Sequence, residues 1–122
     1  MIEIGNCTKL QFLDVSNNDF ITDMSMSVIG TNCTELMALS ISKCHNIHTV
    51  KVVSTQLESL YIRECHSICV VEIPLASNLL SLHIGKCNNI RMTEIRNCTN
   101  LQELHISGPG LRSAKFNILS HL

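Results

Sequence analysis

This 122-residue chain has few aromatic side chains: three Phe, one Tyr and no Trp, which is 3% of the residues. At 45% hydrophobic it can still fill a core, but that core must be aliphatic. The formal net charge of −1 provides no field for nucleic acid or an anionic membrane. No apolar run approaches the ~20 residues that span a bilayer. The composition therefore favours a single domain, residues 1–122, with neither nucleic acid nor a membrane as partner.

The number and spacing of the cysteines argue against a framework of disulfide bonds. Seven is an odd number, and no two of them form a C-x-x-C pair. The sequence as given opens Met-Ile-Glu-Ile-Gly, which is neither a basic leader nor an apolar signal. Reduced thiols and a cytoplasmic location are the expectation.

Three N-x-T triplets leave a secreted or surface origin open, because this pattern is the acceptor for N-glycosylation. The triplets are Asn6-Cys7-Thr8, Asn32-Cys33-Thr34 and Asn97-Cys98-Thr99. Each occupies the same place before a repeat. We therefore favour a turn with an inward Cys as the reason for the pattern.

The main positive feature is a twelve-residue pattern, L-x-x-L-x-[IV]-x-x-[CN]-x-x-I. It begins at Leu10, Leu36, Leu57 and Leu79, and a degenerate copy begins at Leu101. In that last copy, Pro109 stands where Cys or Asn is expected. A regular period in this range predicts a solenoid, here of about five coils of 21–26 residues.

Each repeat contains two short strands. In the third copy, Leu60 and Ile62 alternate with outward neighbours, as one half-buried strand would. Cys65 follows, where an inward thiol can hydrogen-bond the backbone of the turn. Val71-Glu72-Ile73 forms a second alternating stretch, and Pro74 ends it.

The second stretch recurs along the chain, so stacking predicts two parallel sheets around a flattened core. Its copies are Ile2-x-Ile4, Met24-x-Met26, Val50-x-Val52, Val71-x-Ile73, Thr93-x-Ile95 and Ala114-x-Phe116. This alignment places Lys51 beside Glu72, and Glu94 beside Lys115. Few residues remain for helices, except that residues 21–30 have room for about two turns ending at Gly30.

The pattern resembles that of the leucine-rich repeat family over nearly the whole chain. Cys33-Thr34-Glu35-Leu36 and the segment Leu39–Ile47 resemble the cysteine-containing repeats of F-box-type proteins. The shorter later coils resemble the irregular repeats of plant immune receptors. No F-box, nucleotide-binding or kinase segment is present, so those activities are not implied. The resemblance implies a β-rich solenoid of the α/β-horseshoe class that binds another protein through its first sheet.

The outward positions of that sheet in the last three coils form the candidate partner-binding site. The outward residues of the first two coils are small and polar, so the site is expected in the C-terminal half. Tyr and Arg are the residue types enriched at binding hot spots. The predicted site residues are Tyr61, Arg63, His83, Glu103 and His105. A solvated face whose true contacts lie elsewhere is the competing interpretation.

A structural role is the alternative function. The chain starts half a repeat in and shows no polar cap, although solenoids need caps. It is therefore expected to be a segment of a longer array, or to meet a partner or a second copy at its ends. Charges placed at Ile4 or Phe116 should then break self-association.

Metal binding and catalysis are not expected. Cys44, Cys65 and Cys87 form a column, and stacked coils lie ~4.8 Å apart, which does not surround a tetrahedral ion. Buried cysteines behave as small apolar groups. A second possible metal-binding cluster lies at the coil corner. It combines two Cys-His pairs, 44–45 and 65–66, with His48 and Cys69.

Two nucleophile–base pairs can be proposed, Cys69 with His48 and Ser59 with His83, but both lie on open surfaces without a cleft. Gly108-Pro109-Gly110 is a turn rather than a phosphate-binding loop. The sequence thus predicts no enzyme, no metal and no cofactor.

Overall fold

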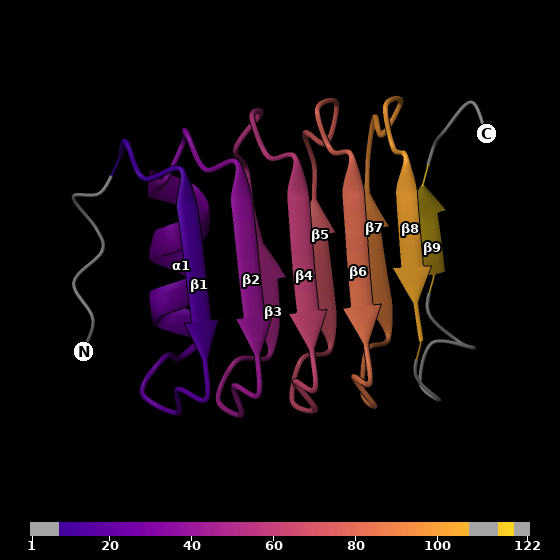
Figure 1. Ribbon diagram of the computed structural model, residues 1–122. Helices are drawn as coiled ribbons and strands as arrows, with labels where there is room; N and C mark the ends of the chain where they lie inside the picture. The colour runs from indigo at the N-terminus through magenta and orange to yellow at the C-terminus, as the bar shows by residue number, and fades with distance from the viewer. Residues whose placement is uncertain (1–7, 108–114, 119–122) are drawn as a thin grey trace.

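The chain forms a two-sheet solenoid (Figure 1). The computed structural model describes residues 8–107, together with the backbone of residues 115–118. A five-stranded sheet with the order β1-β2-β4-β6-β8 lies in front of a four-stranded sheet with the order β3-β5-β7-β9. Each coil supplies one strand to the first sheet, and the coils after the first supply one to the second. This arrangement confirms the predicted solenoid of stacked coils with two parallel sheets.

All strand pairs in both sheets are parallel and continuous in register. The first sheet comprises β1 (Phe12–Ser16), β2 (Ala38–Ser42), β4 (Ser59–Arg63), β6 (Ser81–Gly85) and β8 (Glu103–Ile106). The second comprises β3 (Thr49–Lys51), β5 (Val70–Ile73), β7 (Met92–Ile95) and β9 (Lys115–Ile118).

Aliphatic ladders fill the space between the sheets. Leu39, Leu60 and Leu82 stack in register and are completely buried. The isoleucines two residues further along these strands form a second ladder, equally buried. Burying one such side chain contributes roughly 1.5–3 kcal/mol, so repetition compensates for the lack of aromatic residues.

A left-handed residue follows each of the first four strands of the first sheet. The φ angles are 51° at Asn17, 52° at Lys43, 54° at Glu64 and 56° at Lys86. After the last three of these, the next residue is a buried Cys whose thiol donates to a strand-end carbonyl. The Sγ–O distances are 3.4 Å from Cys44 to Ser42, 3.3 Å from Cys65 to Arg63 and 3.5 Å from Cys87 to Gly85. The thiols therefore serve the turn, as the sequence predicts.

The N-terminal helix differs from the expectation. α1 (Asp23–Asn32) occupies the place where Met24-x-Met26 was aligned with the second-sheet strands, so that assignment is wrong. Met26 is buried, but Met24 is 71% exposed. The 26-residue first repeat has enough chain for a helix, and a helix satisfies its own backbone donors and acceptors without a neighbouring strand.

Gly30 lies inside α1 rather than at its end, which also corrects the sequence prediction. Its carbonyl accepts a hydrogen bond from Val53 N at 3.0 Å. A Cβ atom at Gly30 would lie only 1.8 Å from the carbonyl oxygen of Lys51. Glycine is therefore required because the helix backbone packs directly on β3.

Asp23 fastens the start of α1 to the start of β3. Its carboxylate accepts from His48 N at 2.7 Å and Thr49 N at 3.1 Å, and lies 2.8 Å from His48 Nδ1. Burial raises the pKa of Asp23, but these donors outweigh it and lower the pKa below its usual 3.8. The first coil is thus joined to the second by polar contacts as well as packing.

The predicted pairing of Lys51 with Glu72 is confirmed by the register, but that of Glu94 with Lys115 is wrong. Glu94 lies opposite Asn117, and Lys115 lies opposite Met92. A shift of two residues keeps every side chain on its face, so alternation alone cannot fix this register. Glu94 accepts instead from Nε of Arg96 at 2.8 Å.

Two of the three N-x-T triplets lie at turns with a buried Cys, as predicted; the first of these two turns begins at the last residue of α1. Thr34 N donates to Asn32 O, and Thr99 N donates to Asn97 O, each at 3.0 Å. Cys33 and Cys98 are completely buried. The first triplet, the Ile2-x-Ile4 stretch and the 108–110 turn lie outside the described residues. Within the described ranges, no helix is long and apolar enough to cross a membrane.

One buried hydroxyl lacks a partner, and its removal should stabilise the protein. Thr93 on β7 is completely buried, and its Oγ1 forms no hydrogen bond within the described structure. Thr93→Val keeps the shape and removes the unpaired group, so the free energy of unfolding should rise by about 1 kcal/mol. Urea denaturation measures this change.

Ser54→Ala is the matched control, since the Ser54 hydroxyl is also buried but is bonded. Ser54 Oγ donates to Leu36 O at 2.8 Å and accepts from Gln56 N at 3.2 Å. This variant should lose roughly 1–3 kcal/mol. Destabilisation by Thr93→Val would contradict the assignment of an unpaired hydroxyl.

Candidate recognition surface

Three rings stand side by side on the outward face of the first sheet. The register places Tyr61 beside His83 and His83 beside His105, on β4, β6 and β8. The ring centroids of Tyr61 and His83 are 4.7 Å apart, and those of His83 and His105 are 5.7 Å apart. The parallel register therefore assembles, from single residues of three repeats, what we call the ring ladder.

Glu103 joins the ring ladder from the start of β8. Its Oε2 lies 3.4 Å from His83 Nε2 and accepts from Ser81 Oγ at 3.4 Å. Glu103 itself is 65% exposed, so it forms a polar margin rather than a buried anchor. An exposed contact of this kind contributes at most about 1 kcal/mol.

A depression of about 450 Å³ lies beside the ring ladder, and we call it the C-terminal hollow. Its lining residues are Tyr61, Arg63, His83, Gly85, Lys86, His105 and Ser107. Four of the five predicted site residues thus line one hollow, whereas Glu103 contacts it only through His83. Lys86 also lines the hollow but is not among the predicted site residues, because it follows the strand and so lies outside the alternating positions. The left-handed turn places it at the hollow.

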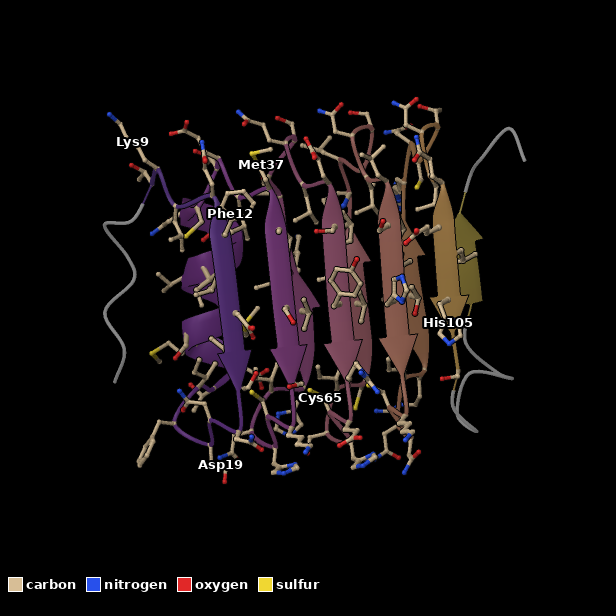
Figure 2. All side chains as sticks on the ribbon, in the orientation of Figure 1. Lys9, Phe12, Asp19, Met37, Cys65 and His105 are labelled. Atoms are coloured by element: carbon tan, nitrogen blue, oxygen red, sulfur yellow. The ribbon has the colours of Figure 1, made fainter. Side chains whose placement is uncertain are left out.

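A second depression of about 330 Å³, the N-terminal hollow, lies on the same face. Its lining residues are Phe12, Leu13, Asp14, Ala38, Leu39, Ser40, Ser59 and Tyr61. Phe12 is 66% exposed, because the residue opposite it is Ala38, whose methyl group gives little cover. The expectation that this half is only small and polar is therefore wrong. Figure 2 shows Phe12 and His105 toward opposite edges of the sheet.

The cysteine column is part of the core and has no exposed chemistry. Cys44, Cys65 and Cys87 are completely buried with free thiols. Burial raises the pKa of Cys65 to about 11, and burial also raises the pKa of Cys87 and of Cys98. Such thiols stay protonated and unreactive at neutral pH.

These raised pKa values predict alkaline sensitivity. Below pH 9.0, the ordinary pKa of a thiol, the contribution of these buried, protonated thiols to the stability of the fold is fully present. Between pH 9 and about 11 the unfolded chain releases thiol protons that the folded chain retains, so stability falls as pH rises. The melting temperature should therefore decrease progressively over this range, and Cys65→Ala should lessen the decrease. A flat pH profile would contradict the effect of burial.

The structure brings two members of the corner cluster together, but their side chains are bonded to other groups. His48 and Cys69 line one shallow hollow of about 530 Å³, together with Ser67 and Arg91. The Cys69 thiol donates to Ser67 O at 3.4 Å, and His48 Nδ1 is bonded to Asp23. No hydrogen bond joins this thiol to this imidazole, nor Ser59 to His83, in the described structure. In residues 8–107, no three His, Cys, Asp or Glu side chains are arranged to hold a metal ion.

Comparison with known families agrees with this architecture. The family model described as the At1g61320/AtMIF1 LRR domain matches residues 1–120. The chain belongs to this leucine-rich repeat family. Searches of curated proteins and of solved structures found no match. Leucine-rich repeat domains are in general scaffolds for protein interaction and are typically non-catalytic, so the family agrees with a surface that presents contacts rather than reactive groups.

Proposed function

We propose that this protein is a non-catalytic scaffold that recognises another protein through the outward face of the first sheet. The observation that carries the proposal is the ring ladder beside the C-terminal hollow. Its rings are held by adjacent strands and by one another. Little side-chain entropy therefore remains to be lost when a partner binds.

Tyr61 occupies the position expected of the central anchor. It lines both hollows, so a partner that spans the face would enclose it from two sides. Binding hot spots gather at the centre of an interface, where neighbouring contacts exclude water. Arg63, at the end of the same strand, adds a guanidinium to the C-terminal hollow.

A substitution test separates this face from the rest of the molecule. The triple variant Tyr61→Ala, Arg63→Ala, His105→Ala removes the anchor, the guanidinium and one end of the ring ladder. Partners captured from a lysate by the intact chain should not bind this variant. Its circular dichroism spectrum should be unchanged, and its melting temperature should stay within a few degrees of that of the intact chain.

The matched control is Lys51→Ala, Glu72→Ala, Arg91→Ala, which changes three outward residues on or beside the second sheet. This control should retain the same partners. If both triple variants retain them, the first-sheet face is not the binding site.

Self-assembly is the second candidate function, and a different observation favours it. Three large apolar side chains of the first coil are exposed: Phe12 by 66%, Phe20 by 81% and Met24 by 71%. Exposed apolar groups on one coil of a solenoid are suited to contact with a second copy. Sedimentation velocity at rising concentration should show a dimer that Phe20→Glu with Met24→Glu abolishes; a monomer throughout would exclude this function.

We also propose a reducing compartment, such as the cytoplasm, as the protein's location. The support is the packing role of the cysteines. Oxidation of the completely buried thiols would place polar groups in an aliphatic core.

A further inference from the structure

The C-terminal hollow carries two cations without a carboxylate partner. Neither Arg63 nor Lys86 forms an ion pair within residues 8–107, and both are exposed. The two nearest glutamates in the register are engaged elsewhere. Glu64 lies 3.9 Å from Lys43 Nζ, and Glu103 lies 3.4 Å from His83 Nε2. The hollow therefore presents positive charge, although the whole chain has a net charge of −1.

The floor between these cations is open. Gly85 lies directly beside Arg63 in the register and immediately precedes Lys86. A Cβ atom built on Gly85 would meet only Ser107 Oγ, at 3.6 Å. No side chain of β6 thus fills the space between Arg63, Lys86 and Ser107. All three offer hydrogen-bond donors, and acceptors on a ligand would satisfy them.

The dimensions suit an extended peptide. The hollow spans three adjacent strands, which is about 10 Å at the usual spacing. A segment of about three extended residues covers that distance. The Tyr61 ring forms one wall, against which an apolar neighbour of the acidic residue can pack.

We infer that the C-terminal hollow binds an extended, acidic segment of the partner protein, with a Glu or Asp carboxylate between Arg63 and Lys86. This inference rests on the proposed function and specifies the partner's chemistry. A guanidinium matches a carboxylate bidentately, and a lysine adds a second charge. Two cations in a chain of slightly negative net charge are too few for a nucleic-acid surface.

The test is selection of random linear peptides displayed on phage against the intact chain, followed by affinity measurement with the best peptide. Enriched peptides should share an acidic residue. Replacing that residue with its amide, or using the Arg63→Ala, Lys86→Ala double variant, should each weaken binding at least about tenfold. Raising the salt from about 50 to about 300 mM should weaken it too, since surface charge attraction is screened.

The matched control is Lys9→Ala with Arg91→Ala. It removes the same two charge types from exposed positions outside the hollow and should leave affinity unchanged. If the enriched peptides are neutral and Tyr61→Ala abolishes their binding, the acidic specificity is overturned while the recognition face stands. Acidic peptides that bind the double variant equally well, or no enrichment at all, would overturn the inference. If a version of the peptide with phosphoserine in place of the acidic residue binds more tightly, the ligand group is a phosphate rather than a carboxylate.

Discussion

Gly30→Ala is expected to destabilise the protein by about 3 kcal/mol. The added methyl group would lie 1.8 Å from Lys51 O and 3.0 Å from its carbonyl carbon, both backbone atoms of β3. No side-chain rotation relieves such a contact. The helix must move away from β3, and the Gly30 O to Val53 N bond is lost. Alanine's better helix propensity returns only about 1 kcal/mol, so the steric effect wins.

Urea denaturation and the far-ultraviolet circular dichroism signal of the helix measure this change. Gly85→Ala is the control, since its methyl group meets only Ser107 Oγ at 3.6 Å. The control should change stability by less than about 0.5 kcal/mol. If Gly30→Ala were neutral or stabilising, α1 would not pack on β3 as described.

Leu60→Ala should destabilise the protein by about 2–5 kcal/mol. Leu60 is completely buried on β4 and stacks between Leu39 and Leu82. Its removal leaves a cavity in the middle coil, and each coil of a solenoid is held only by its neighbours. We therefore expect the unfolding transition to broaden as well as to shift, because the two halves become less coupled.

The adjacent residue on the same strand provides the control. Tyr61 points outward and lines the hollows, so Tyr61→Ala should change stability far less than Leu60→Ala while weakening partner binding. Differential scanning calorimetry of both variants makes the comparison. Equal losses of stability would mean that the inward and outward faces of β4 have been assigned the wrong way round.

The repeat pattern was sufficient to predict the coils, the two parallel sheets and the inward ladders. The reason is that alternation along a strand assigns each side chain to a face, and a regular period stacks like on like. The same logic predicted that Tyr61, His83 and His105 share one face. Their ring distances and the two hollows came from the structure.

Pattern reasoning failed where backbone packing or chain length decides. The Met24-x-Met26 alternation resembles a strand, but the longer first repeat forms α1, and Gly30 is needed for contact with β3. The register of β9 differs by two residues from the predicted one, since such a shift leaves every face unchanged. Lys86 belongs to the hollow because of a turn conformation that spacing does not report.

The sequence by itself determined the family, the solenoid and the face on which each repeat displays its outward residues, because these follow from periodicity. Only the tertiary structure decided which outward residues act together. The pairing of Arg63 with an open glycine floor, the engagement of Glu64 and Glu103 elsewhere, and the exposure of Phe12 depend on contacts between coils. Such contacts join residues some twenty positions apart, and their geometry is fixed only when the coils stack.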